Sequence, residues 1–126
     1  MKALVVDDSR AIRILLAGYL KDLGFSVEDA EDGFDALDQL EAHGLFDLVL
    51  VDWWMPNMTG IELVKAVREK AEYDKMPLMM VTTESHVESM SDALMAGANE
   101  YMMKPFDSEA LAEKLQLMGF ETSKTN

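Results

Sequence analysis

Short apolar runs alternate with segments of helical period along the chain, and this alternation constrains the fold more than any other feature. Candidate strands lie at Ala3–Val6, Ser26–Ala30, Leu48–Val51, Leu78–Val81 and Glu100–Met103. Continuous apolar runs are typical of central strands in a parallel sheet, whereas the mixed run Ser26–Ala30 indicates an edge strand. Since strands that alternate with helices pair in parallel through right-handed crossovers, the pattern predicts a doubly wound α/β fold.

Five helices are predicted between and after the strands. The clearest keeps apolar residues at helical spacing from Ile12 to Leu23 and ends at Gly24, which suits the left-handed turn after a helix. The others are marked by Ala36 to Leu40 before Gly44, Ile61 to Ala71, Val87 to Leu94 before Gly97, and Leu111 to Met118. We expect one domain over residues 1–120 and a polar C-terminal tail over residues 121–126 that frays.

Composition narrows the classes of function. The 126 residues carry a formal net charge of −13, which argues against the clustered cations that nucleic-acid binding requires. The absence of cysteine excludes disulfides, thiol catalysis and cysteine-ligated metals, and it fits a reducing cytoplasm. No apolar run approaches the roughly 20 residues that span a bilayer, and Asp7 and Asp8 end the first run too early for a secretory leader. We therefore expect a soluble cytoplasmic protein without a nucleic-acid partner or membrane insertion.

Charged and hydroxyl side chains stand at the predicted carboxyl ends of the strands. Asp7 and Asp8 follow the first strand, Asp52 the third and Lys104 the fifth, while Thr82 ends the fourth. Because sites in doubly wound sheets lie beyond the carboxyl ends of the strands, these side chains are expected to converge. Each has an ordinary explanation alone, since acids favour helix starts, threonine favours strands and lysine favours solvated loops. Their joint placement at one edge is what indicates a site.

Three carboxylates brought together need a counter-charge. Two unit charges about 4 Å apart repel by roughly 4 kcal/mol at an effective dielectric of about 20. Lys104 supplies one positive charge, and a hard divalent cation would supply two. Oxygen ligands without His or Cys, and without a calcium-binding loop, favour Mg²⁺, with Mn²⁺ able to substitute. An aspartate beside Mg²⁺, a lysine and a hydroxyl has what an aspartyl phosphate requires.

Four segments resemble the response-regulator receiver domain family, and among its members most of all the chemotaxis regulators. They are Asp7–Ser9, Asp52–Gly60, Met80–Glu84 and Ala96–Phe106, in the order and at the spacing of the family. The resemblance covers nearly the whole chain and implies the flavodoxin-like strand order 2-1-3-4-5. It also implies a regulatory protein rather than an enzyme, one that promotes its own phosphotransfer and dephosphorylation.

The resemblance implies roles for individual residues of the site. Asp52 would accept a phosphoryl group from a histidine kinase, and Lys104 would pair with the phosphoryl oxygens. Asp7 would act mainly through water in the outer shell of the metal. The ligands implied for Mg²⁺ are Asp8, Asp52 and the backbone carbonyl of Trp54. The peptide bond before Pro105 is expected to be cis.

Switching and the lifetime of the phosphate involve further residues by the same resemblance. Thr82 would move its hydroxyl onto a phosphoryl oxygen and Tyr101 would turn inward, which changes the surface of the fourth helix, fifth strand and fifth helix. Trp54 stands where the family often has a small or polar residue, and Thr83 is larger than the usual alanine or glycine. Trp54, Thr83 and Glu84 are therefore expected to modulate the rate of phosphoryl turnover.

The expected function is that of a stand-alone, monomeric response regulator that signals to the flagellar motor in chemotaxis. Its expected partners are a histidine kinase, a motor-switch or phosphorelay protein on the surface just named, and a phosphatase. A phosphorelay shuttle without a motor target is the alternative within the family. A haloacid-dehalogenase-like hydrolase needs a second aspartate where this chain has Trp54. In a flavodoxin-like electron carrier, Asp7 and Asp8 would repel the flavin phosphate.

Overall fold

The computed structural model describes residues 1–121 and shows a parallel sheet with helices on both faces. The strands are β1 (Lys2–Val6), β2 (Ser26–Ala30), β3 (Leu48–Val51), β4 (Leu78–Thr82) and β5 (Glu100–Met103), in the order β2-β1-β3-β4-β5. The predicted doubly wound fold and the strand order are therefore confirmed, with β2 at an edge. Residues 122–126, which belong to the predicted polar tail, lie outside the described residues.

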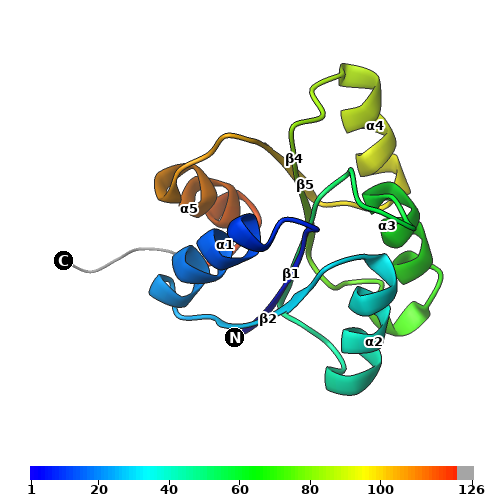
Figure 1. Cartoon of the computed structure of the whole chain (residues 1–126), viewed down its shortest axis with the longest axis horizontal. Coiled ribbons are helices and arrows are strands. Elements are labelled where there is room, and N and C mark those ends of the chain that lie inside the picture. The colour runs from blue at the N-terminus through cyan, green and yellow to red at the C-terminus, as the bar shows by residue number, and fades with distance from the viewer. Residues whose placement is uncertain (122–126) are drawn as a thin grey trace.

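The helices form two layers, one on each face of the sheet. They are α1 (Arg10–Asp22), α2 (Gly33–His43), α3 (Gly60–Arg68), α4 (Val87–Ala96) and α5 (Ser108–Leu117), with a short 3-10 turn η1 (Ala71–Tyr73). Figure 1 shows α1 and α5 on one face and α2, α3 and α4 on the other. Among the described residues, none of the helices combines the length and the apolar character needed to cross a membrane.

The apolar strands divide their side chains between two cores. Successive residues of a strand point to opposite faces of the sheet, so one strand contributes to both layers. In β1, Leu4 and Val6 lie in the core beneath α2, α3 and α4, whereas Ala3 and Val5 lie in the core beneath α1 and α5. This burial on both faces explains why β1 and β3 are apolar at every buried position, as the sequence pattern predicts.

The third helix ends earlier than the sequence predicts. The apolar pattern continues to Ala71, but α3 stops at Arg68 because Lys70 adopts an extended backbone with φ −96° and ψ 118°. The following turn η1 places Tyr73 in the core. The Arg68 side chain closes this end of the helix by donating hydrogen bonds to the carbonyl oxygens of Tyr73 and Gly97.

The apolar residues that predict the fourth helix are mostly not buried. Val87 is 78% exposed, Leu94 is exposed as well, and Met90 is half-buried. Met95, which follows the predicted pattern, is 84% exposed. Ala93 is the buried residue of α4. The helix itself is confirmed, and it ends at Gly97 with a φ of 123° that favours glycine. The exposed side of α4 thus carries apolar side chains beside the polar Glu88, Ser91 and Asp92.

Gly60 starts α3 directly against the end of β3. A Cβ atom at this position would collide with the backbone carbonyl of Asp52 and would lie 2.9 Å from Cε of Met80. The Gly60 N–H donates a hydrogen bond to the Trp53 carbonyl at 2.8 Å, which folds the loop after Asp52 back onto the helix. The close approach of two backbone segments therefore requires glycine at this position.

We expect Gly60→Ala to lower the free energy of unfolding by about 1–3 kcal/mol, because its methyl group overpacks the junction with Asp52. Gly18→Ala is the matched control, since Gly18 lies inside α1 and its added Cβ would meet nothing within 4 Å. Alanine in a helix interior stabilises by about 0.5–1 kcal/mol relative to glycine. Urea denaturation measures both variants, and a Gly60→Ala midpoint equal to that of the parent would contradict this packing.

Candidate functional site

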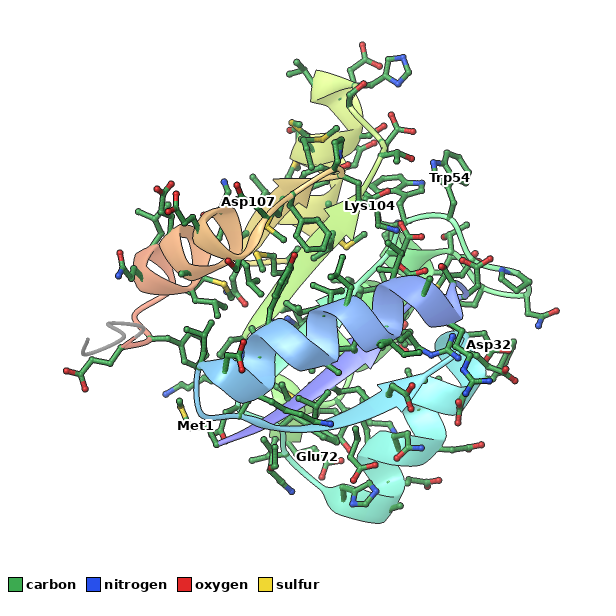
Figure 2. All side chains as sticks on the ribbon, turned by 60° about the vertical axis from the view of Figure 1, so that its left-hand side comes forward. Met1, Asp32, Trp54, Glu72, Lys104 and Asp107 are labelled. Carbon is green, nitrogen blue, oxygen red and sulfur yellow. The ribbon has the colours of Figure 1, made fainter. Side chains whose placement is uncertain are left out.

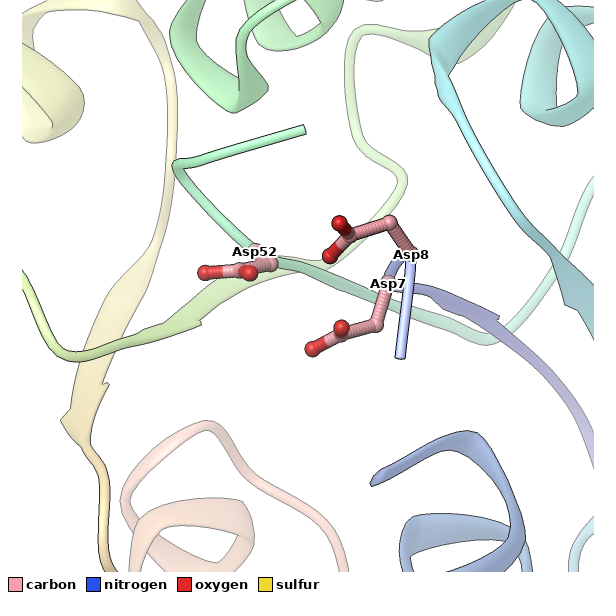
Figure 3. A group of neighbouring side chains, drawn as sticks. All are labelled: Asp7, Asp8 and Asp52. Atoms are coloured by element: carbon pink, nitrogen blue, oxygen red, sulfur yellow. The ribbon is translucent and has the colours of Figure 1, made fainter. Parts of the chain in front are cut away.

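Three aspartates meet at the carboxyl ends of β1 and β3. Val6 of β1 lies opposite Val51 of β3 in parallel register, so the residues that follow these strands leave the sheet side by side. Figure 3 shows Asp7 and Asp8 at the end of β1 and Asp52 at the end of β3, with the side chain of Asp8 turned toward Asp52. One oxygen from each of the carboxylates lies within 4.8 Å of the others.

Lys104 provides the positive charge expected beside these acids. Its Nζ donates a hydrogen bond to Oδ2 of Asp7 at 2.8 Å and lies 3.5 Å from Oδ2 of Asp52. The lysine side chain is 14% exposed and both carboxylates are buried, so solvent ions screen these interactions only weakly. The backbone N–H of Lys104 donates to the Thr82 carbonyl at 2.9 Å, and the peptide bond between Lys104 and Pro105 is cis.

The pKa of the Asp52 carboxyl is raised above its ordinary value. Burial is the largest cause; the positive charge of Lys104 opposes it, and the negative charge of Asp7 adds to it. Hydrogen bonds from the Thr82 hydroxyl and from the Trp53 backbone also lower the pKa, but their effects are the smallest. The balance shows that the protein's own groups do not fully compensate an ionised Asp52, and a further cation would do so.

Asp7 and Asp8 differ in how their carboxylates are held. Asp7 accepts hydrogen bonds from the Ser9 N–H at 2.8 Å and from Lys104. The exposed side chain of Asp8 makes no hydrogen bond or ion pair with any described residue. Ser9 caps α1, since its hydroxyl accepts from the Ile12 N–H at 3.3 Å. Capping of the helix therefore does not explain the two acids.

The donor chemistry of the group fits a hard divalent cation. The carboxylates of Asp7, Asp8 and Asp52 are the one set of three potential metal ligands found within residues 1–121, and it contains no nitrogen or sulfur. Oxygen ligands of this kind suit Mg²⁺ and Mn²⁺. The backbone carbonyl of Trp54 accepts no hydrogen bond from the described part of the chain, which leaves it free to serve as a neutral ligand.

Thr82 and Tyr101 are joined through the loop between β4 and α4. The buried Thr82 hydroxyl accepts a hydrogen bond from the Glu84 N–H at 3.2 Å. The buried Tyr101 side chain donates its hydroxyl proton to the Glu84 carbonyl at 2.6 Å. Burial, followed by the negative charges of Glu84 and Asp52, raises the pKa of Tyr101 to about 12, so the phenol remains a donor. The ring of Tyr101 thus already points inward.

Two of the residues expected to modulate the rate, Trp54 and Thr83, are exposed near Lys104. Trp54 is 56% exposed, and Figure 2 shows it at the same end of the molecule as Lys104, opposite to Met1. Its ring centroid lies 6.3 Å from that of Trp53. Thr83 is exposed and lines an apolar cavity of about 330 Å³ together with Lys104.

Sequence reasoning did not identify Arg13, which the structure places beside the acidic group. Its Nη1 donates a hydrogen bond to the backbone carbonyl of Asp7 at 2.7 Å, and its Nε donates to Oδ2 of Asp29 at 3.0 Å. One signal could have indicated Arg13: it is a cationic residue near the start of a helix that begins at a predicted site. The role of Ser9 as the N-cap of α1 was also not predicted, although serine before a helix is a common N-cap.

Comparison with known proteins gives the family. The family described as the response regulator receiver domain matches residues 3–116. The chemotaxis protein CheY of Pseudomonas aeruginosa is 42% identical over 117 residues, which cover 92% of this chain and 94% of that protein. The chemotaxis protein CheY-3 of Vibrio cholerae is 43% identical over 116 residues, which cover 91% of this chain and 88% of that protein.

Solved structures lead to the same result. The structure of the chemotaxis response regulator CheY4 of Vibrio cholerae matches with a TM-score of 0.85 and 41% identity, over 92% of this chain and 96% of that one. The receiver domain of the Francisella response regulator 1452 matches with a TM-score of 0.82 and 27% identity, over 93% and 94% of the two chains. From its sequence match and its fold, the chain belongs to the response regulator receiver domain family.

Proposed function

We propose that this chain is a switch turned on by phosphorylation of Asp52, with a histidine kinase as the phosphoryl donor. Mg²⁺ would be held by Asp8, Asp52 and the backbone carbonyl of Trp54, with Asp7 in its outer shell. The observation that carries the proposal is the group of three carboxylates with Lys104 against it at the carboxyl edge of the sheet. Membership of the receiver domain family supports it.

The chemistry requires a nucleophile and positive charge around the transferred phosphoryl group. Bound Mg²⁺ would supply charge that offsets both the carboxylates and the phosphoryl oxygens. An oxygen of Asp52 forms a bond to phosphorus, the bond to the histidine nitrogen of the donor breaks, and that nitrogen keeps the electron pair. Lys104 lies 3.5 Å from Asp52, so its ammonium group is placed to pair with a phosphoryl oxygen on that carboxylate.

The switch is proposed to act through the loop between β4 and α4. The Thr82 hydroxyl lies close enough to Asp52 to lower its pKa, and it would donate to an oxygen of the new phosphoryl group. Thr82 and Tyr101 both form hydrogen bonds with the backbone of Glu84. A shift of Thr82 would therefore change the hydrogen bond that keeps the Tyr101 ring in place. Because that ring is already inward, phosphorylation would favour an arrangement that exists beforehand, which is a shift of populations.

The proposed output surface is formed by α4, β5 and α5. The exposed apolar side chains of Val87 and Met95 give this surface the adaptable character of a binding face. The relatives named as chemotaxis proteins support a flagellar motor-switch protein as the partner, a cytoplasmic location and a regulatory role. A phosphorelay shuttle would use the same site with another partner.

Asp52→Asn should abolish labelling by radioactive acetyl phosphate in the presence of Mg²⁺, because the amide cannot act as the acceptor. Asp38→Asn is the control, since Asp38 is an exposed carboxylate of α2 outside the acidic group. It should be labelled as the parent is. Labelling of Asp52→Asn at the parental level would refute the proposed acceptor. Rapid turnover of external phosphoesters without a lasting label would favour the hydrolase alternative.

Trp54→Asn should speed the loss of phosphate from Asp52 severalfold, because the indole at the rim of the site screens the phosphoryl group from water. Leu117→Asn removes an exposed apolar side chain from the last residue of α5 and serves as the control. The decay of labelled protein after removal of the donor gives both rates. A Trp54→Asn rate equal to that of the parent would rule out the proposed screening.

A further inference from the structure

Arg13 donates two hydrogen bonds beside the acidic group, one to a backbone carbonyl and one to a carboxylate. The proposed phosphoryl chemistry uses neither of them. The side chain is 14% exposed, so it is largely withdrawn from solvent. Its Nη1 donates to the Asp7 carbonyl at 2.7 Å and its Nε to the Asp29 carboxylate at 3.0 Å. Asp29 belongs to β2, so Arg13 joins α1 to the ends of two neighbouring strands.

The carbonyl that Arg13 binds belongs to the peptide unit that leads into Asp8. A peptide unit is planar, so fixing the carbonyl oxygen of Asp7 also fixes the direction in which the backbone of Asp8 begins. The Asp7 carboxylate has partners of its own in Lys104 and Ser9. The Asp8 side chain has no hydrogen bond or ion pair with any residue in 1–121. The orientation of the Asp8 carboxylate therefore depends on its backbone.

We propose that Arg13 is a positioning residue for the cation site: by fixing the Asp7 carbonyl, it directs the Asp8 carboxylate toward Asp52 and so raises the affinity for Mg²⁺. The inference rests on the proposed function, because it assumes that Mg²⁺ binds there. The positive charge of Arg13 by itself would lower the affinity for Mg²⁺, since a guanidinium group near the site repels a cation. A loss of affinity on removal of Arg13 therefore cannot come from the loss of its charge.

The pair with Asp29 explains why this position uses arginine. The planar guanidinium group presents several donors at fixed angles, so Nε can bind Asp29 while Nη1 binds the Asp7 carbonyl. A lysine ammonium is a single point donor that cannot span both acceptors in this arrangement. Arg13→Lys is accordingly expected to keep the charge of the parent but only part of its affinity for Mg²⁺.

Calorimetric titration of Mg²⁺ into the metal-free chain at constant ionic strength tests the proposal. Arg13→Met should raise the dissociation constant about tenfold or more, in the range found when groups that orient metal ligands are removed. Arg10→Met is the matched control, because Arg10 begins α1, is exposed, and has no hydrogen bond or ion pair with the described residues. Its loss of charge should leave the dissociation constant unchanged or lower it.

A double-mutant cycle with Asp8→Asn separates positioning from a general structural effect. If Arg13 acts through Asp8, Arg13→Met should change the dissociation constant little when Asp8 is already replaced. An equal loss of affinity in both backgrounds would overturn the proposal, as would equal binding by Arg13→Met and Arg10→Met. Failure of the parent to bind Mg²⁺ would instead refute the proposed function, and this inference with it.

Circular dichroism of each metal-free variant shows whether it remains folded. If Arg13→Met does not fold, Asp29→Asn weakens the same contact from its other end without removing the bond to Asp7. That variant should bind Mg²⁺ more weakly than the parent, although by a smaller factor than expected for Arg13→Met. Unchanged affinity in Asp29→Asn would then overturn the proposal.

Discussion

Repulsion among three carboxylates at the carboxyl edge of the sheet is the constraint on which the rest of the structure depends. Parallel pairing of β1 with β3 forces the acids that follow these strands into one place, and burial of both strands on two faces holds them there. Lys104 compensates part of this charge, yet the pKa of Asp52 stays raised, mainly because the carboxyl is buried. A divalent cation would resolve the conflict, and under the proposed function the compensated carboxylate of Asp52 would accept a phosphoryl group.

Much of the fold could be predicted because it follows from local pattern. Continuous apolar runs located β1, β3 and β4, and Gly24 and Gly97 marked helix ends that need positive φ values. The strand order came only from the resemblance to the family. The early end of α3 is accompanied by a hydrogen bond from Arg68 to the carbonyl of Gly97, which is distant in sequence. The exposure of Val87 depends on how α4 lies on its neighbours. Such features are set by tertiary contacts, which periodicity does not encode.

Some parts of the candidate site could likewise be predicted from the sequence, and others could not. Asp52, Lys104 and Thr82 carry distinctive side chains directly at strand ends, so parallel topology was enough to bring them together in advance. The parts that could not be predicted act on backbone atoms: Arg13 binds the Asp7 carbonyl, and Tyr101 binds the Glu84 carbonyl. Every residue has a carbonyl group, so a sequence gives no sign of which one a distant side chain will bind.

The dependence of thermal stability on Mg²⁺ tests the central claim most directly. A ligand that binds only the folded chain raises its unfolding temperature as its concentration passes the dissociation constant. At constant ionic strength, Mg²⁺ should raise the unfolding temperature of the parent in a saturable manner, and Asp8→Asn should lose most of this rise. An unfolding temperature that does not respond to Mg²⁺, or that rises equally in Asp8→Asn, would contradict the account of the acidic group as a cation site.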